Sequence, residues 1–167
     1  MIKTKRLILK PLSPVELEKY LKAPNDLAND LGLTPSATKM DQETSEAILN
    51  DLLPHVSDSS KNYLFYTMWI VIEKNLKAII GGICFHGEPD ENGEVEIGFG
   101  TDDDYQNKGY MTEVIRGMIE WSKNQGKITV LRAETNNDNI SSQKVLMKNG
   151  FQISKQNEDT TIFKLKV

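Results

Sequence analysis

The chain has 167 residues, of which 38% are hydrophobic and 26% charged, and this size suits one globular domain spanning residues 1–167. The formal net charge of −4 argues against non-specific nucleic-acid binding, which needs a concentrated basic surface. There is no apolar run of membrane-spanning length and no signal-peptide pattern at the N-terminus. We therefore expect a cytoplasmic protein that neither binds nucleic acid nor enters a membrane.

The residues that could bind metal or form disulfides are few. Cys84 is the only cysteine, which excludes an intramolecular disulfide and fits a reducing compartment. His55 and His86 have no Cys or His companions at ligand spacing, so we expect no metal site.

The N-terminal third predicts one strand and two helices. Residues 5–12 alternate like a strand, and Ser13-Pro14-Val15-Glu16 predicts a capped helix that runs to about Lys22. Residues 23–40 contain several breakers and predict a connecting segment with one short turn. A second helix is predicted over 41–53, ended by Pro54.

The middle of the chain predicts three strands in succession. Residues 63–72 are continuously aromatic and β-branched, which indicates a central strand. Residues 78–85 form the next strand, in which Gly81 and Gly82 suggest a bulge. The third strand, residues 95–101, places Val95, Ile97 and Phe99 on one face and Glu96, Gly98 and Gly100 on the other. Such a bare glycine face favours the close approach of a ligand or a second backbone.

The C-terminal part alternates helices with strands. After Gly109 the apolar residues follow helical spacing, and Gly126 ends this helix. A strand over 128–135, a helix capped by residues 136–138 and ended by Gly150, and a closing hairpin of 151–154 with 160–167 complete the chain. The order of elements predicts an α/β fold, a mixed sheet with helices on both faces.

The loop before the helix that follows Gly109 is suited to phosphate, because a helix N-terminus presents free N–H groups and a positive dipole end. Its pattern Gln106-x-x-Gly109-x-Met111 resembles the pyrophosphate-binding motif of the GNAT superfamily of acyl-CoA-dependent N-acetyltransferases. Met111 stands where that motif has Gly or Ala, as is familiar in the ribosomal-protein N-acetyltransferase branch. Asn139-x-x-Ser142, followed by residues 145–151, resembles the later helix of the superfamily, and residues 4–12 resemble the first strand of that branch.

This resemblance implies the GNAT fold, with a mostly antiparallel sheet, and acetyl-CoA as the donor. It implies that the pantetheine arm lies where strand 95–101 splays from strand 128–135, and that an N–H within 99–101 polarises the thioester carbonyl. The cofactor-binding residues implied are Phe99, Gly100, Thr101, Gln106, Asn107, Lys108, Gly109, Tyr110, Met111, Thr112, Asn139 and Ser142. Asn139 could instead serve only as a helix cap.

The residues that would move protons have alternatives. Glu96 is the candidate general base, directly or through a water; alternatively it points to solvent or pairs with a cation such as Arg132. Many relatives carry a tyrosine general acid where this chain has Leu146, so Tyr110, Ser142 or water would supply the thiolate proton. His86 could face the acceptor cleft, although a structural role is favoured, and Cys84 reads as a buried, inert thiol. Asp102, Asp103 and Asp104 read as a solvated loop.

We interpret the chain as an N-acetyltransferase that transfers acetyl from acetyl-CoA to a primary amine, either a protein N-terminus or a small molecule. The alternative is an acyl-CoA-binding regulatory domain without transfer activity. A nucleotide-binding protein is disfavoured because Walker and dinucleotide motifs are missing. A homodimer is a further expectation, because dimers are common among similar proteins.

Overall fold

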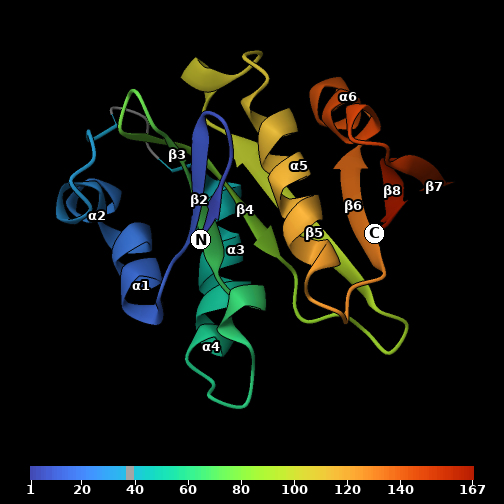
Figure 1. Cartoon of the computed structure of the whole chain (residues 1–167), viewed down its shortest axis with the longest axis horizontal. Coiled ribbons are helices and arrows are strands. Elements are labelled where there is room, and N and C mark those ends of the chain that lie inside the picture. Colours follow the sequence, from blue (N-terminus) through green and yellow to red (C-terminus); the bar gives the residue numbers. More distant parts are fainter. Residues whose placement is uncertain (37–39) are drawn as a thin grey trace.

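One eight-stranded sheet runs through the molecule. The computed structural model describes residues 1–36 and 40–167, apart from the side chain of Glu43. The strand order is β1-β2-β3-β4-β5-β6-β8-β7, and among these neighbours only β5 and β6 pair in parallel (Figure 1). The strands are β1 Ile2–Lys3, β2 Leu7–Pro11, β3 Met68–Glu73, β4 Ala78–Phe85, β5 Glu94–Thr101, β6 Val130–Asn136, β7 Gln152–Gln156 and β8 Thr160–Lys166.

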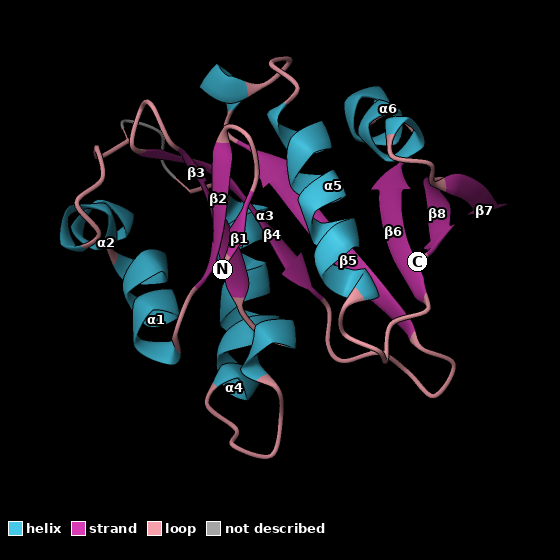
Figure 2. Ribbon diagram, viewed as in Figure 1, coloured by secondary structure: helices cyan, strands magenta, loops and turns pink. Residues whose placement is uncertain are grey.

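Helices cover both faces of this sheet, as predicted (Figure 2). The helices are α1 Pro14–Lys22, α2 Pro24–Asp30, α3 Gln42–Ala47, α4 Leu53–Val56, α5 Tyr110–Lys123 and α6 Ile140–Lys148, with a π-helix, η1, at Ile48–Leu52 and 3-10 turns η2 and η3 at Tyr63–Phe65 and Asp103–Tyr105. One core lies beneath α5 and α6, and the other lies beneath α1, α2, η1 and α4. None of the helices in the described ranges has the length and apolar character needed to cross a membrane.

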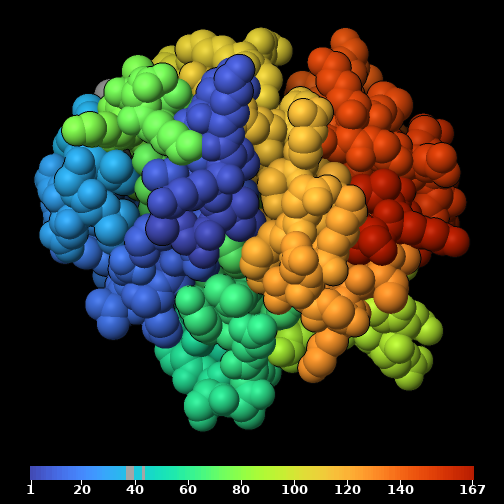
Figure 3. Space-filling model, in the orientation of Figure 1, coloured from blue at the N-terminus to red at the C-terminus, as the bar shows by residue number. Residues whose placement is uncertain are grey.

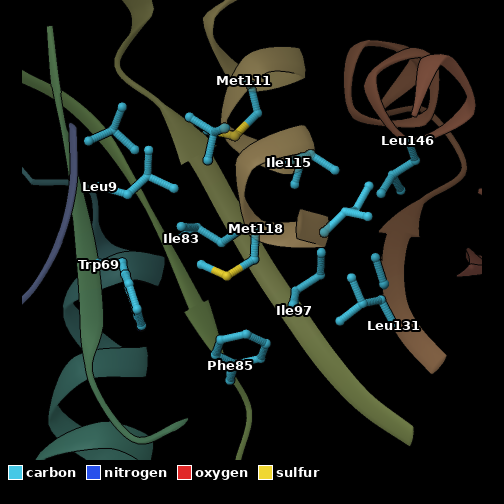
Figure 4. Close-up of a cluster of buried hydrophobic side chains, with 14 of the residues drawn as sticks. Leu9, Trp69, Ile83, Phe85, Ile97, Met111, Ile115, Met118, Leu131 and Leu146 are labelled. Atoms are coloured by element: carbon cyan, nitrogen blue, oxygen red, sulfur yellow. The ribbon is translucent and has the colours of Figure 1, made fainter. Parts of the chain in front are cut away.

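The helix α5 joins the two halves of the sheet. Its apolar stripe, Met111, Ile115 and Met118, points onto the sheet beside Ile97 (Figure 4). Its other side lies against the N-terminal strands, which run directly beside it on the molecular surface (Figure 3). The stripe explains why a single amphipathic helix can hold β5 and β6 in place although the two strands pair only briefly.

Several predicted elements have the expected bounds. Helix α1 begins at Ser13 with a complete capping box, because the Ser13 side chain accepts from the Glu16 N–H and the Glu16 side chain accepts from the Ser13 N–H. Strand β4, helix α5 and the closing hairpin β7–β8 are also confirmed, with ends shifted by a few residues. The bulge in β4 is confirmed: the pairing with β3 slips next to Gly81.

The strand predicted over 63–72 is wrong in its first half. Residues 63–65 form η2, and β3 begins only at Met68. The Asn62 side chain caps this turn by accepting from the Leu64 N–H, and the Phe65 ring packs 5.1 Å from the Phe85 ring. The apolar run therefore begins in a turn, which buries Phe65 in the core and leaves Tyr63 exposed.

Two further predictions need correction in the first half of the chain. The segment 23–40 holds a seven-residue helix, α2, because Pro24 occupies its first position and starts it; residues 37–39 lie outside the described residues. Pro54 does not end the next helix. The chain widens into η1, whose end carries a Leu53 N–H to Ile48 carbonyl bond, and α4 continues to Val56. Because a proline clashes with the carbonyl four residues earlier, the wider π turn lets the helix pass it.

The cap of α6 also differs from the prediction. Its N-cap is Asn139, whose side chain accepts from the Ser142 N–H at 3.1 Å, and not residues 136–138. Residue 136 is the last of β6.

Candidate active site

The strands β5 and β6 separate after a short pairing. They pair only from Glu94 with Val130 to Glu96 with Arg132. Beyond this point β5 continues to Thr101 against β4, and β6 continues to Asn136 against β8 (Figure 1). The splay that the resemblance implied is therefore present.

The separation leaves one edge of β5 without a strand partner. The His86 N–H donates to the Glu96 carbonyl and the Asp102 N–H to the Ile80 carbonyl, both at 3.0 Å. Because hydrogen-bonding groups alternate sides along an antiparallel strand, Phe99 and Thr101 direct their N–H and C=O groups away from β4. The Thr101 carbonyl accepts from Gln106 Nε2 at 3.3 Å. The Phe99 groups face the gap, where an extended chain can add to the sheet.

A cavity of about 670 Å³ lies along this edge, within the usual size of a small-molecule site. Its wall on one side is β5 from Glu96 to Thr101, and on the other it is the end of β6 with Asn139 and Ser142. Helices α2 and α3 contribute further residues. We call this cavity the cofactor cleft.

The glycine face of β5 has two different causes. A Cβ at Gly98 would lie 2.7 Å from His86 Nε2, so the small residue makes room for that ring. A Cβ at Gly100 would meet nothing within 4 Å, so this position keeps the cleft open. Gly81 of β4 is needed for backbone approach, because a Cβ there would lie 2.3 Å from the Gly100 carbonyl oxygen.

The loop Gln106–Gly109 ends at an uncapped helix. Gly109 is the N-cap of α5 with φ of 72°, and no side chain caps the helix there. The left-handed conformation suits glycine, and Asn107 also has a positive φ of 59°. The N–H groups of Tyr110, Met111 and Thr112 have no partner within the helix because they belong to its first turn. Met111 is 8% exposed and packs in the core, so its size leaves these N–H groups accessible.

Arg6 supports this loop and was missed by the sequence analysis. Its Nη1 donates to the Lys108 carbonyl at 3.0 Å, and its guanidinium lies 4.4 Å from the centre of the Tyr110 ring. Its Nε donates to Glu113 in the first turn of α5. The only available signal was its place in the segment 4–12, which carries no indication of a partner 102 residues away.

Other loop side chains bond within the loop. Gln106 Nε2 donates to Asp103 Oδ1 at 2.8 Å, and Lys108 Nζ donates to the Asp104 carbonyl at 2.7 Å. A phosphate bound here would therefore be held mainly by backbone N–H groups.

Glu96 forms an ion pair with Arg132, its register partner on β6. Arg132 Nη2 also contacts Glu134 at 2.5 Å. This is the pairing that the sequence analysis left open as an alternative. It places Glu96 in the cleft wall with its charge compensated, and its role as a base stays a prediction.

Asn139 and Ser142 both line the cleft. Asn139 Oδ1 accepts from the Ser142 N–H and from the Ser141 hydroxyl, so this amide is a helix cap. Its Nδ2 has no hydrogen-bond partner within residues 1–36 and 40–167, so it can still donate to a ligand. Thr135 Oγ1, in the same wall, is buried and likewise lacks a partner in the described ranges.

Tyr110 lies outside the lining of the cleft, with its ring against Arg6. Leu146 is fully buried in the core beneath α6. Of the proton donors considered, Ser142 is the side chain that the fold brings to the cleft.

A second cavity of about 520 Å³ adjoins the cofactor cleft. The two share Ala47, Cys84 and His86 in their walls. The second cavity also contains the carboxylates Asp51 and Glu88 and the ring of Tyr66. Lys61 closes one side, where its Nζ lies 2.9 Å from His55 Nδ1. We call this second cavity the acceptor cavity.

Two other predictions about titratable groups can be compared with the structure. Burial raises the pKa of the Cys84 thiol to about 12, against a smaller opposing effect of the Gly98 N–H, so the inert thiol is confirmed. Burial raises the pKa of Asp102, and the nearby charges of Asp41, Asp103 and Asp104 raise it further. Asp102 is therefore less solvated than predicted. Within the described part of the chain, no three His, Cys, Asp or Glu residues are grouped as a metal site.

The groups in and beside the cleft fit acetyl-CoA. The unpaired edge of β5 suits an extended amide chain, and Thr135 Oγ1 is a buried polar atom that needs a partner. The uncapped N-terminus of α5 suits a pyrophosphate, but the predicted loop residues 106–112 lie outside the lining of the cleft.

Comparison with known proteins agrees with this geometry. The family model for the acetyltransferase (GNAT) domain matches residues 6–152. The uncharacterized N-acetyltransferase YjdG of Bacillus subtilis is 30% identical over 151 residues, covering 90% of this chain and 89% of the relative. The ribosomal-protein-S5-alanine acetyltransferase of Vibrio fischeri superposes with a TM-score of 0.71 at 18% identity, covering 98% of this chain and 94% of the other. RimL, a ribosomal L7/L12 alpha-N-protein acetyltransferase solved in complex with coenzyme A, gives 0.66 at 15% identity over 98% and 96% of the two chains.

Proposed function

Because the chain belongs to the GNAT acetyltransferase family, we propose that it transfers the acetyl group of acetyl-CoA directly to a primary amine. The observation that carries this proposal is the unpaired edge of β5, which runs along the cofactor cleft towards the uncapped N-terminus of α5. Bound acetyl-CoA would supply an activated acetyl thioester. The chain's own groups position it and handle the protons.

Each part of the cleft has a role in this proposal. The first-turn N–H groups of α5 bind the pyrophosphate, and the edge of β5 binds the pantetheine arm. The Phe99 N–H, which points into the gap, polarises the thioester carbonyl, because a fixed donor stabilises negative charge that develops on oxygen. Asn139 Nδ2 and Ser142 donate to the arm from the opposite wall. Ser142, which lines the cleft, also protonates the departing thiolate in this proposal.

The acceptor cavity holds the amine. Its carboxylates Asp51 and Glu88 favour a cationic group over an anionic one. Its walls come from η1, α4 and the end of β4, so the amine approaches from the sheet face opposite α5. The candidate bases on this face of the sheet are Glu96 and His86.

The proposal is tested by measuring thiol release from acetyl-CoA with two pooled acceptor sets. One set holds short peptides with varied free N-termini, and the other holds small amines that include polyamines and aminoglycosides. The names of two structural neighbours refer to ribosomal proteins, which is why peptides are included. Faster release with peptides supports a protein N-terminal acetyltransferase; faster release with small amines supports a metabolite-modifying or drug-modifying enzyme.

A second candidate is a regulatory domain that binds acyl-CoA without transferring it, and buried Leu146 favours it. Many relatives carry a tyrosine general acid at that position, and no other tyrosine takes its place in the cleft near α6 within the described residues. Tight acetyl-CoA binding by calorimetry, without thiol release in either pool, would support this candidate and contradict the transferase.

A further inference from the structure

A row of three polar residues crosses the sheet on the face opposite α5. His86 follows β4 directly, and its N–H donates to the Glu96 carbonyl on β5 at 3.0 Å. Glu96 is in turn the register partner of Arg132 on β6. Directly paired residues of neighbouring strands present their side chains to the same face, so these three lie side by side.

Glu96 and Arg132 are bound to each other, whereas the His86 ring is available to bind a proton or a ligand. Glu96 pairs with Arg132, and Arg132 also holds Glu134. The His86 ring forms no hydrogen bond with any residue that the structure describes. It is exposed to the cavities and not packed in the core.

The His86 ring lies where the two cavities meet. It is in the wall of both the cofactor cleft and the acceptor cavity. Its Nε2 lies against Gly98, where a Cβ would be only 2.7 Å away. The imidazole therefore lies beside Gly98, and the next residue on β5 is Phe99, whose N–H points into the cleft.

We propose that His86 is the general base that deprotonates the acceptor amine, and that Glu96 serves to hold Arg132. This inference rests on the proposed acetyl transfer. Cys84 also lines both cavities but is a buried, neutral thiol. The His86 ring lines both cavities and has no bonded partner among the described residues, whereas the Glu96 carboxylate is compensated by a cation.

Two protons leave the acceptor nitrogen in this reaction. His86 Nε2 takes one proton from the ammonium form of the acceptor. The nitrogen lone pair then forms the bond to the acetyl carbon, while the carbon–sulfur bond breaks and its electron pair leaves with sulfur. The second proton of the nitrogen reaches the sulfur as a thiol, through Ser142 or water, and His86 releases its proton to solvent.

The surroundings favour the neutral form of this base. The His86 side chain is exposed, yet the cavity walls partly desolvate it and lower its pKa below the ordinary value of 6.5; Asp51 on η1 opposes this shift and Arg132 on β6 adds to it. Glu96 on β5 faces the ring as well, but it is paired with Arg132. Cys84, the nearest titratable group on the same strand, stays a neutral thiol. Because its pKa is lowered below 6.5, His86 is mostly unprotonated at pH 7 and can accept a proton.

The test compares His86→Gln with Glu96→Gln, using the best acceptor from the pooled assay. We expect His86→Gln to lower kcat by roughly 10²- to 10⁴-fold and to leave the acetyl-CoA dissociation constant within about twofold. It should lose the acid limb of kcat/KM whose midpoint lies below 6.5, and keep only the fall that protonation of the acceptor amine itself imposes. Glu96→Gln should keep that acid limb. Added imidazole should restore part of the turnover of His86→Ala.

A measurement without turnover completes the test. The chain has two histidines, so the ring proton signals in a wild-type NMR titration can be assigned with His55→Gln. The midpoint of His86 should lie below 6.5 and coincide with the acid limb of wild-type kcat/KM.

The outcomes separate the two proposals. Wild-type protein that releases no thiol with any amine contradicts acetyl transfer, and the base with it. Active wild-type protein whose His86→Gln variant keeps its turnover and its acid limb overturns the role of His86 alone. Loss of the acid limb in Glu96→Gln instead would assign the base to Glu96.

Discussion

Arg6 and Glu113 are 107 residues apart in sequence and are joined by two hydrogen bonds, from the Arg6 N–H to Glu113 Oε1 and from Arg6 Nε to Oε2, each at 2.7 Å. The same guanidinium donates to the Lys108 carbonyl. The residue just before β2 thereby fixes both the first turn of α5 and the loop before it. The proposed phosphate-binding geometry depends on this connection between the N-terminal segment and the middle of the chain.

Glu113→Gln should lower the free energy of unfolding by about 1.5–3 kcal/mol at pH 7, the range for hydrogen bonds to charged groups. Burial alone would raise the pKa of Glu113, but the hydrogen bonds from Arg6 and Thr4 outweigh it and lower the pKa below 4.5. A lowered folded-state pKa contributes stability above 4.5 that is lost as the pH falls through the folded value. Urea unfolding at several pH values measures the difference, which should shrink in acid.

Glu120→Gln is the matched control on the same helix. Its side chain is 65% exposed and pairs with Lys123 on the surface, so its loss should cost less than about 1 kcal/mol. Equal effects of the two variants at every pH would contradict the role given to Glu113.

Gly109→Val should weaken acetyl-CoA binding by at least about tenfold, or ~1.4 kcal/mol, measured by calorimetry. Gly109 has φ of 72°, and a β-branched residue there would disturb the loop that presents the N–H groups. Gly126→Val is the control, because Gly126 has φ of 66° at the opposite end of α5 with open space around it. It should lose comparable stability while binding acetyl-CoA normally; unchanged binding by Gly109→Val would remove the phosphate assignment.

Asn139→Ser should separate capping from cofactor binding. Serine caps a helix about as well as asparagine, so stability should change by only a few tenths of a kcal/mol, whereas Asn139→Ala should lose about 1 kcal/mol. Both variants lack the Nδ2 donor and should bind acetyl-CoA more weakly. If the serine variant binds normally, Asn139 acts only as the cap that its bond to the Ser142 N–H indicates.

Ser142→Ala should lower turnover about tenfold or more, because Ser142 lines the cleft and is the side chain proposed to protonate the thiolate. Tyr110→Phe should stay within about twofold, because the Tyr110 ring packs against Arg6 outside the cleft lining. Steady-state kinetics at saturating acetyl-CoA compares them. The reverse order of effects would make Tyr110 the acid and require the loop to move.

The sequence predicted those elements whose signals are local. The capping box at Ser13, the apolar stripe of α5 and the glycine at its start depend on neighbours a few residues away, and the structure contains all three. One error arose because the apolar residues 63–65 match the pattern of a buried strand, although they form a turn. The others arose because Pro24 and Pro54 match the pattern of helix breakers, although each lies in the first turn of a helix.

The sequence by itself determined the family motifs, the uncapped turn at Gly109 and the glycine face of β5, because backbone conformation and side-chain period are local properties. Only the tertiary structure decided which groups meet. The bond of Arg6 to Lys108, the pair of Glu96 with Arg132, and the place of His86 between two cavities each join segments through sheet register and helix packing. Such contacts depend on strand order and on where β5 leaves β6, which no local pattern of residues encodes.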